Sequence, residues 1–263
     1  MRKEIKRAFS SPLFFLSALM FFLTLQGYAI PAHLHGLAYE PLKYRPDALS
    51  LSLGGIFFGG VILLMPFCAP MAHAVSQVDD LRSGIMQWSV LRSSIRKYVI
   101  SKTLSTFLAS AVSLGGAFSI HALAWNLLAL PYDPINYPAH EIAFWEQSLF
   151  FEWSTIHHAL PIYIHITLGI ALSAGVWGVT ALASAVWIPD KLLAVTIPAC
   201  IYKLWGGNLT FYLFNVWLES PDTLFNDAQT TQTIMQGLTS YGILLALSLT
   251  IYYYGVRRRA CHA

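Results

Sequence analysis

Charged residues are scarce in this chain. Only 11% of its 263 residues are Asp, Glu, Lys or Arg, whereas 56% are hydrophobic. Soluble domains carry about 25% charged residues. The shortage of charge therefore excludes an ordinary soluble domain and indicates an integral membrane protein.

Cysteine and the familiar catalytic motifs are also rare or missing. Three isolated cysteines form no CxxC pair and no zinc-ligand spacing, so neither a disulfide framework nor a metal site is indicated. No GxxxxGK[ST] loop is present to cradle the phosphates of ATP. GxSxG and HExxH motifs are absent as well, and no pair of aspartates lies within an apolar run. We expect no catalytic residue, no metal and no cofactor bound by this chain itself.

Long apolar runs are abundant. A bilayer core of about 30 Å is crossed by about 20 apolar helical residues. Six segments meet or approach that length: Leu13–Ile30, Leu51–Val75, Tyr98–Leu130, His158–Trp187, Leu192–Trp205 and Gly237–Tyr254. Only a Pro-Asp turn, Ile188–Lys191, separates the fourth and fifth, which predicts a helical hairpin. The first run has no clear small-x-small cleavage site, so we expect a retained span.

Basic residues lie mostly on one side of these segments. Thirteen of the sixteen Lys and Arg fall at the N-terminus, between segments two and three, in the short turn, or after the last segment. The opposite loops carry only Lys43 and Arg45. Both termini are therefore predicted to face the cytoplasm. Within residues 1–10, Met1, Ile5 and Phe9 form an apolar edge, which favours a helix on the inner membrane surface.

The segment 77–97 between spans two and three is amphipathic. Its apolar residues follow a helical spacing that predicts one stripe: Leu81, Ile85, Trp88, Leu91 and Ile95. Asp79 and Asp80 suit a helix N-terminus, and Arg92 suits the other end. A cytoplasmic helix of this kind offers a surface to a soluble partner. The alternative is that the stripe rests on the inner leaflet or packs against spans two and three.

Two outer segments, 126–157 and 206–236, are rich in aromatic residues. The run LTFYLFNVWLE is too short to span and is flanked by Gly206-Gly207 and by Ser220-Pro221-Asp222, which predicts a re-entrant helix. The alternative for its individual rings is an interfacial aromatic belt. We assign possible roles in the substrate path or re-entrant segment to four residues: Lys203, Phe211, Trp217 and Glu219. Lys203 is either functional, with Glu219 as a partner, or extends to the outer surface.

Nine histidines raise the question of a haem. His121 and His165 lie in different spans and are the pair that could face each other as axial ligands. No cofactor-specific motif accompanies them. A haem is therefore a minor alternative.

The order of these elements resembles the type-2 (ABC-2) permeases of ATP-binding-cassette exporters. Those proteins begin with an inner-surface helix, here Arg2–Ser10, and carry a coupling helix between spans two and three. The matching positions are Asp79-Asp80, Gly84, Ile85–Leu91, Arg92, Arg96 and Lys102. The family also has a short turn between spans four and five and re-entrant helices before span six, here Leu209–Asp227. It often has proline where this chain has Ser93-Ser94.

The resemblance implies a single all-α permease domain, residues 1–263, in a bacterial plasma membrane. It implies a second permease subunit, identical or not, and separate ATPase subunits that hold ATP and magnesium, but no nucleic acid. The implied ATPase-contacting residues are Asp79, Asp80, Leu81, Gly84, Ile85, Trp88, Leu91 and Arg92. The expected cargo is hydrophobic or amphipathic: a peptide, lipopeptide, lipid or drug. Permeases of this size resemble those of bacteriocin and lantibiotic self-protection. A polytopic membrane enzyme and an outer-surface peptide-binding immunity protein without transport remain as alternatives.

Overall fold

A computed structural model describes residues 2–39, 46–57, 61–130, 160–204 and 227–261. These residues are helical apart from short connections and one isolated bridge between Asp47 and Leu130. The helices are α1 (Arg2–Phe9), α2 (Pro12–Tyr39), α3 (Ala48–Phe57), α4 (Val61–His73), α5 (Ser76–Arg82), α6 (Ile85–Arg92), α7 (Ile95–Leu128), α10 (Leu160–Trp187), α11 (Lys191–Leu204) and α14 (Asp227–Cys261).

Three helices are long and apolar enough to cross a membrane: Pro12–Tyr39, Ile95–Leu128 and Ile162–Trp187. The prediction of an all-helical, membrane-embedded protein is thus confirmed over the described residues. The finer prediction of six spans is not established. The predicted second span contains two shorter helices, α3 and α4, and the predicted fifth corresponds to the 14 residues of α11.

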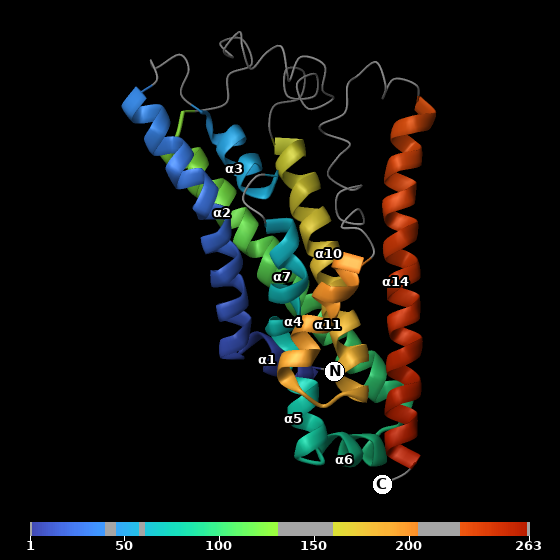
Figure 1. The fold of residues 1–263 in the computed structure, drawn as a ribbon. Coiled ribbons are helices and arrows are strands. Elements are labelled where there is room, and N and C mark those ends of the chain that lie inside the picture. The colour runs from blue at the N-terminus through green and yellow to red at the C-terminus, as the bar shows by residue number, and fades with distance from the viewer. Residues whose placement is uncertain (1, 40–45, 58–60, 131–159, 205–226, 262–263) are drawn as a thin grey trace.

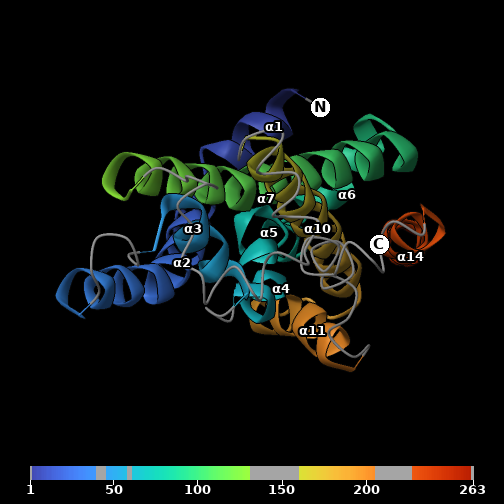
Figure 2. The same ribbon diagram turned by 90° about the horizontal axis from the view of Figure 1, so that it is seen from above.

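The helices form a bundle around α7 and α10, which make the most extensive contact in the described part of the chain. The bundle places α2 and α3 on one side and α14 on the other (Figures 1 and 2). The helices α1, α5 and α6 gather at one end together with the C-terminus of α14 (Figure 1). We call this the α5–α6 end.

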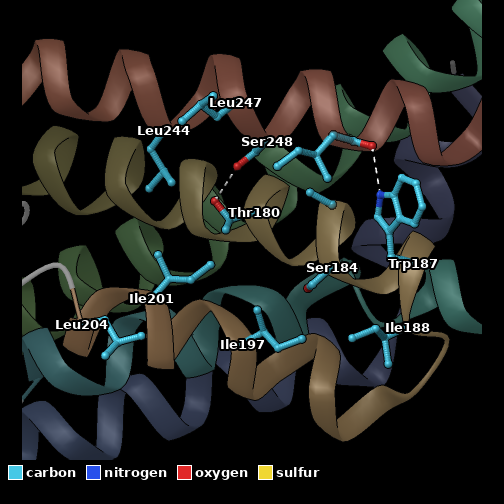
Figure 3. Close-up of a pocket in the computed structure, with 12 residues that line it drawn as sticks. Thr180, Ser184, Trp187, Ile188, Ile197, Ile201, Leu204, Leu244, Leu247 and Ser248 are labelled. Atoms are coloured by element: carbon cyan, nitrogen blue, oxygen red, sulfur yellow. Dashed lines mark hydrogen bonds between the residues drawn. The ribbon is translucent and has the colours of Figure 1, made fainter.

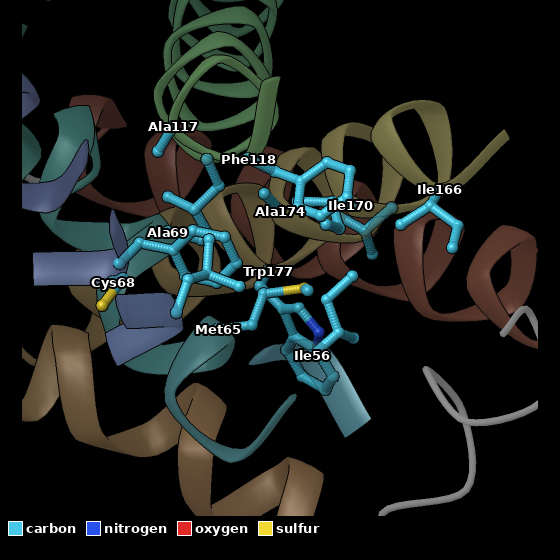
Figure 4. Close-up of a cluster of buried hydrophobic side chains, with 14 of the residues drawn as sticks. Ile56, Met65, Cys68, Ala69, Ala117, Phe118, Ile166, Ile170, Ala174 and Trp177 are labelled. Atoms are coloured by element: carbon cyan, nitrogen blue, oxygen red, sulfur yellow. The ribbon is translucent and has the colours of Figure 1, made fainter. Parts of the chain in front are cut away.

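The main core joins α4, α7 and α10. Met65, Cys68, Phe118, Ile170 and Trp177 are buried there and interdigitate (Figure 4). Lipid tails are as apolar as these side chains, so helix association in a membrane depends on close packing more than on the exclusion of water. Small residues are therefore important where two helices are in contact.

Small residues make that close packing possible between α7 and α10. A methyl group added at Gly115 would lie 3.1 Å from Ala171, and one added at Gly175 would overlap the ring of Phe107. At Gly178 an added methyl would overlap Ser110. Small residues at these positions thus allow α10 to approach α7 closely.

The predicted hairpin between spans four and five is also confirmed. Helix α10 ends at Trp187, and α11 begins four residues later. The Asp190 carboxylate caps α11 by accepting a hydrogen bond from the Leu193 backbone N–H at 3.0 Å. Proline at 189 prevents α10 from continuing, so the two helices pack against each other.

The helix predicted over 77–97 is divided into two short helices. Gly84 adopts a left-handed conformation, with φ +72°, between α5 and α6. After α6 ends at Arg92, the Ser94 hydroxyl accepts a hydrogen bond from the Lys97 N–H and starts α7. Ile95 therefore belongs to α7 and not to the amphipathic segment.

Most of the predicted outer segments lie outside the described residues, as do Phe211, Trp217 and Glu219. Residues 126–128 are the end of α7, and residues 227–236 are the beginning of α14. The last predicted helix thus begins ten residues earlier than Gly237, because helix α14 extends through a polar stretch that has no apolar signal.

Replacing Gly178 by alanine should destabilise the α7–α10 contact by about 1–3 kcal/mol, as overpacking typically does. Ser110 cannot simply turn aside, since its hydroxyl donates a 2.7 Å hydrogen bond to the Ala69 carbonyl oxygen. Gly116→Ala is the matched control, because an added methyl there meets nothing within 4 Å. Unfolding in detergent, followed by tryptophan fluorescence, should give a lower Tm for Gly178→Ala only. Equal Tm values would contradict this packing.

Candidate functional site

A cluster of buried ionic groups lies at the α5–α6 end. Asp80 of α5 accepts a 2.6 Å hydrogen bond from Lys102 of α7 and another of 2.6 Å from Arg7 of α1. The side chains of Asp80 and Lys102 are 1% and 0% exposed. Buried charges are tolerated only when they are paired and hydrogen-bonded, and both conditions are met here. Three helices that are distant in sequence are thereby tied at one carboxylate.

Lys102 uses its remaining donors within the same cluster. Its ammonium group donates to the Ser76 hydroxyl at 2.8 Å and to Glu4 Oε2 at 3.5 Å. His73 Nε2 lies 3.8 Å from the same Glu4 oxygen, which is too far for a strong hydrogen bond but close enough for attraction. His73, Lys102 and Arg7 together lower the pKa of Glu4 from its ordinary 4.5 to about 2. Glu4 is therefore ionised at neutral pH, and it joins α1 to α4 and α7.

An amide next to this cluster connects α5 to two further helices. The Gln77 Oε1 atom accepts hydrogen bonds from the hydroxyls of Tyr98 on α7, at 3.0 Å, and of Tyr252 on α14, at 2.9 Å. Its Nε2 group lies 3.7 Å from the sulfur of Met86 on α6. All of these side chains are buried. One glutamine thus links α5, α6, α7 and α14.

The outer side of α5 is fastened to the turn between α10 and α11. Asp79 pairs with Lys191 at 2.7 Å, and Arg82 donates a 3.0 Å hydrogen bond to the Pro189 carbonyl oxygen. These groups are exposed or half-exposed, so each contact contributes little by itself. Their position matters more, since they connect α5 to the hairpin as well as to the bundle.

Helix α6 has an apolar face that is exposed on the surface of the protein. Ile85, Trp88 and Leu91 are 45%, 65% and 80% exposed, at helical spacing on one side. Met86 is fully buried on the opposite side, where it packs with Tyr252 and Val256 of α14. An exposed cluster of three large apolar side chains at the end of a bundle is typical of a surface that meets lipid or a partner protein.

The residues predicted to contact a partner therefore have different positions. Ile85, Trp88, Leu91 and Arg92 are exposed, and Gly84 forms the break before them. Leu81 is partly buried against the α7–α10–α14 core. Asp80, which the family resemblance implies as an ATPase-contacting residue, is instead internal, and its carboxylate is bound by Lys102 and Arg7. Asp79 is half-exposed and pairs with Lys191.

Sequence reasoning missed Glu4, Arg7, Ser76 and Gln77 as members of the site. Charge at the start of α1 had indicated only a membrane surface. Hydrogen-bond partners that are far apart in the sequence leave no local sequence pattern. The only signal is general: an aspartate and a lysine near the ends of apolar helices are expected to be paired.

The remaining predicted residues do not join this site. Lys203 is exposed in the last turn of α11, and its suggested partner, Glu219, is outside the described residues. His121 is fully buried beside the rings of Phe22, Phe118 and Trp125. In the described part of the chain no group of three or more His, Cys, Asp or Glu side chains could hold a metal ion.

Comparisons of the chain with protein-family models, with curated proteins and with solved structures gave no match. Helix α5 is bonded to α1, α7, α14 and the α10–α11 hairpin, and it adjoins the exposed helix α6. A displacement of α6 can therefore be transmitted through α5 to these helices.

Replacing Lys102 by methionine should destabilise the protein by about 3–5 kcal/mol, because Asp80 would then be buried with one cation fewer. Lys97→Met on the same helix is the control, since Lys97 is exposed and its loss should change stability by less than about 0.5 kcal/mol. Unfolding in mixed micelles with increasing SDS measures both variants. Adding Asp80→Asn to Lys102→Met should recover part of the loss. Equal stability of the two single variants would contradict the assigned role of the ion pair.

Proposed function

We propose that this protein is a permease subunit of an ABC-2 type exporter, driven by a separate ATPase that binds the exposed face of α6. The single observation that carries the proposal is the combination of that face with the internal bonding of α5. Ile85, Trp88 and Leu91 are available to a partner, whereas Asp80 and Gln77 fasten the adjoining helix to the bundle.

This arrangement suits a coupling element better than a membrane-resting helix. A helix that only rests on lipid needs an apolar face but no internal ionic anchor. Here a force applied to α6 at Trp88 would be transmitted through the Met86–Gln77 contact to α5. From α5 it would reach Lys102 of α7 and Tyr252 of α14. The tethers Asp79–Lys191 and Arg82–Pro189 would carry the same load to the α10–α11 hairpin.

The energy source must come from the partner, since the sequence contains no phosphate-binding loop. In this proposal the ATPase holds ATP and magnesium, and closure of its dimer pushes α6. A second permease subunit completes the complex. Its most suitable neighbour is α2, because only 22% of the most apolar stretch of α2 is buried within this chain, against 72% for α10.

The cargo is proposed to be hydrophobic or amphipathic, of the peptide, lipopeptide, lipid or drug kind. The support is the apolar exterior of α2, where Phe15, Leu19 and Leu23 are exposed and face either lipid or a path between two subunits. Self-protection against a membrane-active peptide is the narrower form of this proposal, and it rests on family resemblance alone.

Trp88→Glu should disrupt the complex with the ATPase. Buried tryptophans at interfaces typically contribute 2 kcal/mol or more, so we expect at least about 30-fold weaker binding. The tagged chain is purified from its own cells under mild conditions, and the co-purified ATPase is measured by mass spectrometry and by ATP turnover.

Ser93→Glu is the matched control, since it introduces the same charge at an exposed position just beyond the apolar face. Both variants should keep the wild-type Tm because neither side chain is buried. The proposal would be refuted if no ATPase co-purified with the wild-type chain. It would also be refuted if the Trp88→Glu variant retained the wild-type amount of co-purified ATPase and the wild-type ATP turnover. The first result would favour a non-transporting binding protein or a membrane enzyme.

The proposed cytoplasmic position of α6 can be tested by cysteine labelling in intact cells. In a Cys200→Ser, Cys261→Ser background, Leu91→Cys should react with a membrane-impermeant maleimide only after the cells are permeabilised. Tyr39→Cys, exposed at the far end of α2, should react in intact cells. Labelling of Leu91→Cys from outside would reverse the topology and remove the surface from reach of a cytoplasmic ATPase.

A further inference from the structure

An apolar groove runs between α10, α11 and α14. Its volume is about 740 Å³, within the range of about 300–1,000 Å³ that is typical of small-molecule sites. Large aliphatic side chains of α11 and α14 line it, among them Ile197, Ile201, Leu244 and Leu247 (Figure 3), and α10 contributes smaller side chains and Trp187. Helix α14 contacts α10 and α7 closely, and the groove occupies the space between α14 and α11.

The few polar atoms in the groove are already satisfied. The hydroxyls of Thr180 on α10 and Ser248 on α14 hydrogen-bond to each other at 3.1 Å (Figure 3). Ser184 donates a 2.9 Å hydrogen bond to the Ala181 carbonyl oxygen of its own helix. An occupant of this part of the groove therefore has no polar group to bind, so hydrocarbon is the chemistry that fits.

At the α5–α6 end a second hollow with basic walls adjoins the groove at Trp187. This hollow has a volume of about 530 Å³, and Trp187 lines both spaces. The Trp187 indole is held by a 3.2 Å hydrogen bond from Nε1 to the Ile251 carbonyl oxygen. The Arg258 guanidinium lies over the same ring, 5.5 Å from its centroid.

The two arginines of the second hollow are differently engaged. Arg259 donates hydrogen bonds to the carbonyl oxygens of Val186 and Trp187 at 2.5 and 3.1 Å, so it caps the end of α10. Arg258 is exposed, and among the described residues no carboxylate pairs with it. The stacked, unneutralised guanidinium is a suitable donor for a phosphate oxygen.

We propose that these two adjoining spaces bind one anionic phospholipid, with its phosphate at Arg258 and an acyl chain in the groove. The rise along α14 from Arg258 to Leu244 is about 21 Å, which covers the headgroup region and most of one leaflet. Basic pockets between membrane helices at the cytoplasmic side are a known mode of anionic-lipid binding. The charge favours this occupant over a zwitterionic lipid. The arginine-lined hollow at one end of the groove favours a lipid with a charged headgroup over the apolar face of a second copy of this chain.

The site is tested on the full chain purified alone, without an ATPase, so its outcome is independent of the proposed transport function. Native mass spectrometry measures binding of phosphatidylglycerol and of phosphatidylcholine with identical acyl chains. We expect at least about tenfold preference for phosphatidylglycerol. Arg258→Gln should abolish that preference, whereas Arg257→Gln, exposed on the same turn but not part of the hollow, should retain it.

The apolar part of the site is tested by filling it. Leu247→Trp should reduce the binding of both lipids by about tenfold or more, because the larger ring takes the space of the acyl chain. In the wild type, phosphatidylglycerol with brominated chains should quench tryptophan fluorescence more strongly than in Trp187→Phe, and this measurement remains available if Arg258→Gln fails to fold. Equal quenching of the two proteins would overturn the proposal.

Three further results would overturn it. Equal losses in Arg257→Gln and Arg258→Gln would indicate a general effect of charge. Unchanged lipid binding in Leu247→Trp would place the acyl chain elsewhere. Dissociation of a dimer by Leu247→Trp without any effect on lipid would assign the groove to a second copy.

Discussion

The contact on which the described structure most depends is the buried carboxylate of Asp80 between two cations. Taking such groups out of water costs several kcal/mol for each ion, and the cost is offset only when every partner is in place. Lys102 and Arg7 provide those partners from α7 and α1, at 2.6 Å each. Together with the apolar packing at this end, these bonds hold α1 and α7 to α5, which lies at the point where they meet. The hydroxyls of Tyr98 and Tyr252 on Gln77 extend the same constraint to α14.

This anchoring gives the two short helices of the loop different properties. Helix α5 is bonded on nearly all sides, so it cannot move without its neighbours. Helix α6 is attached through Met86 and through the left-handed Gly84, and its large apolar residues Ile85, Trp88 and Leu91 are exposed on the protein surface. In the proposed function, the division at Gly84 separates the helix that would bind the ATPase from the helix that would transmit its motion. That separation is the structural reason for proposing a driven permease instead of a passive membrane anchor.

Sequence patterns predicted features whose cause is local. Proline and aspartate at 189 and 190 determine the hairpin. The spacing of Ile85, Trp88 and Leu91 placed them on one face, as observed. Features that depend on distant partners were not predictable. Asp80 looked like a cap residue until its bonds to Lys102 and Arg7 were known, and the polar start of α14 gave no helical signal. The membrane class needed only composition, whereas the number of spans depends on shorter helices such as α4 and α11.

The ionic cluster has one more consequence, which concerns the membrane potential. Moving a unit charge through a potential of 100 mV changes the energy by about 2.3 kcal/mol, so charged elements that move in a membrane are sensitive to voltage. The two acids, Glu4 and Asp80, are matched by the two bases, Arg7 and Lys102. These four groups together carry no net charge, so a joint displacement of the cluster would move no net charge through the potential. The electric field across the bilayer would then neither drive nor oppose a joint displacement of this cluster.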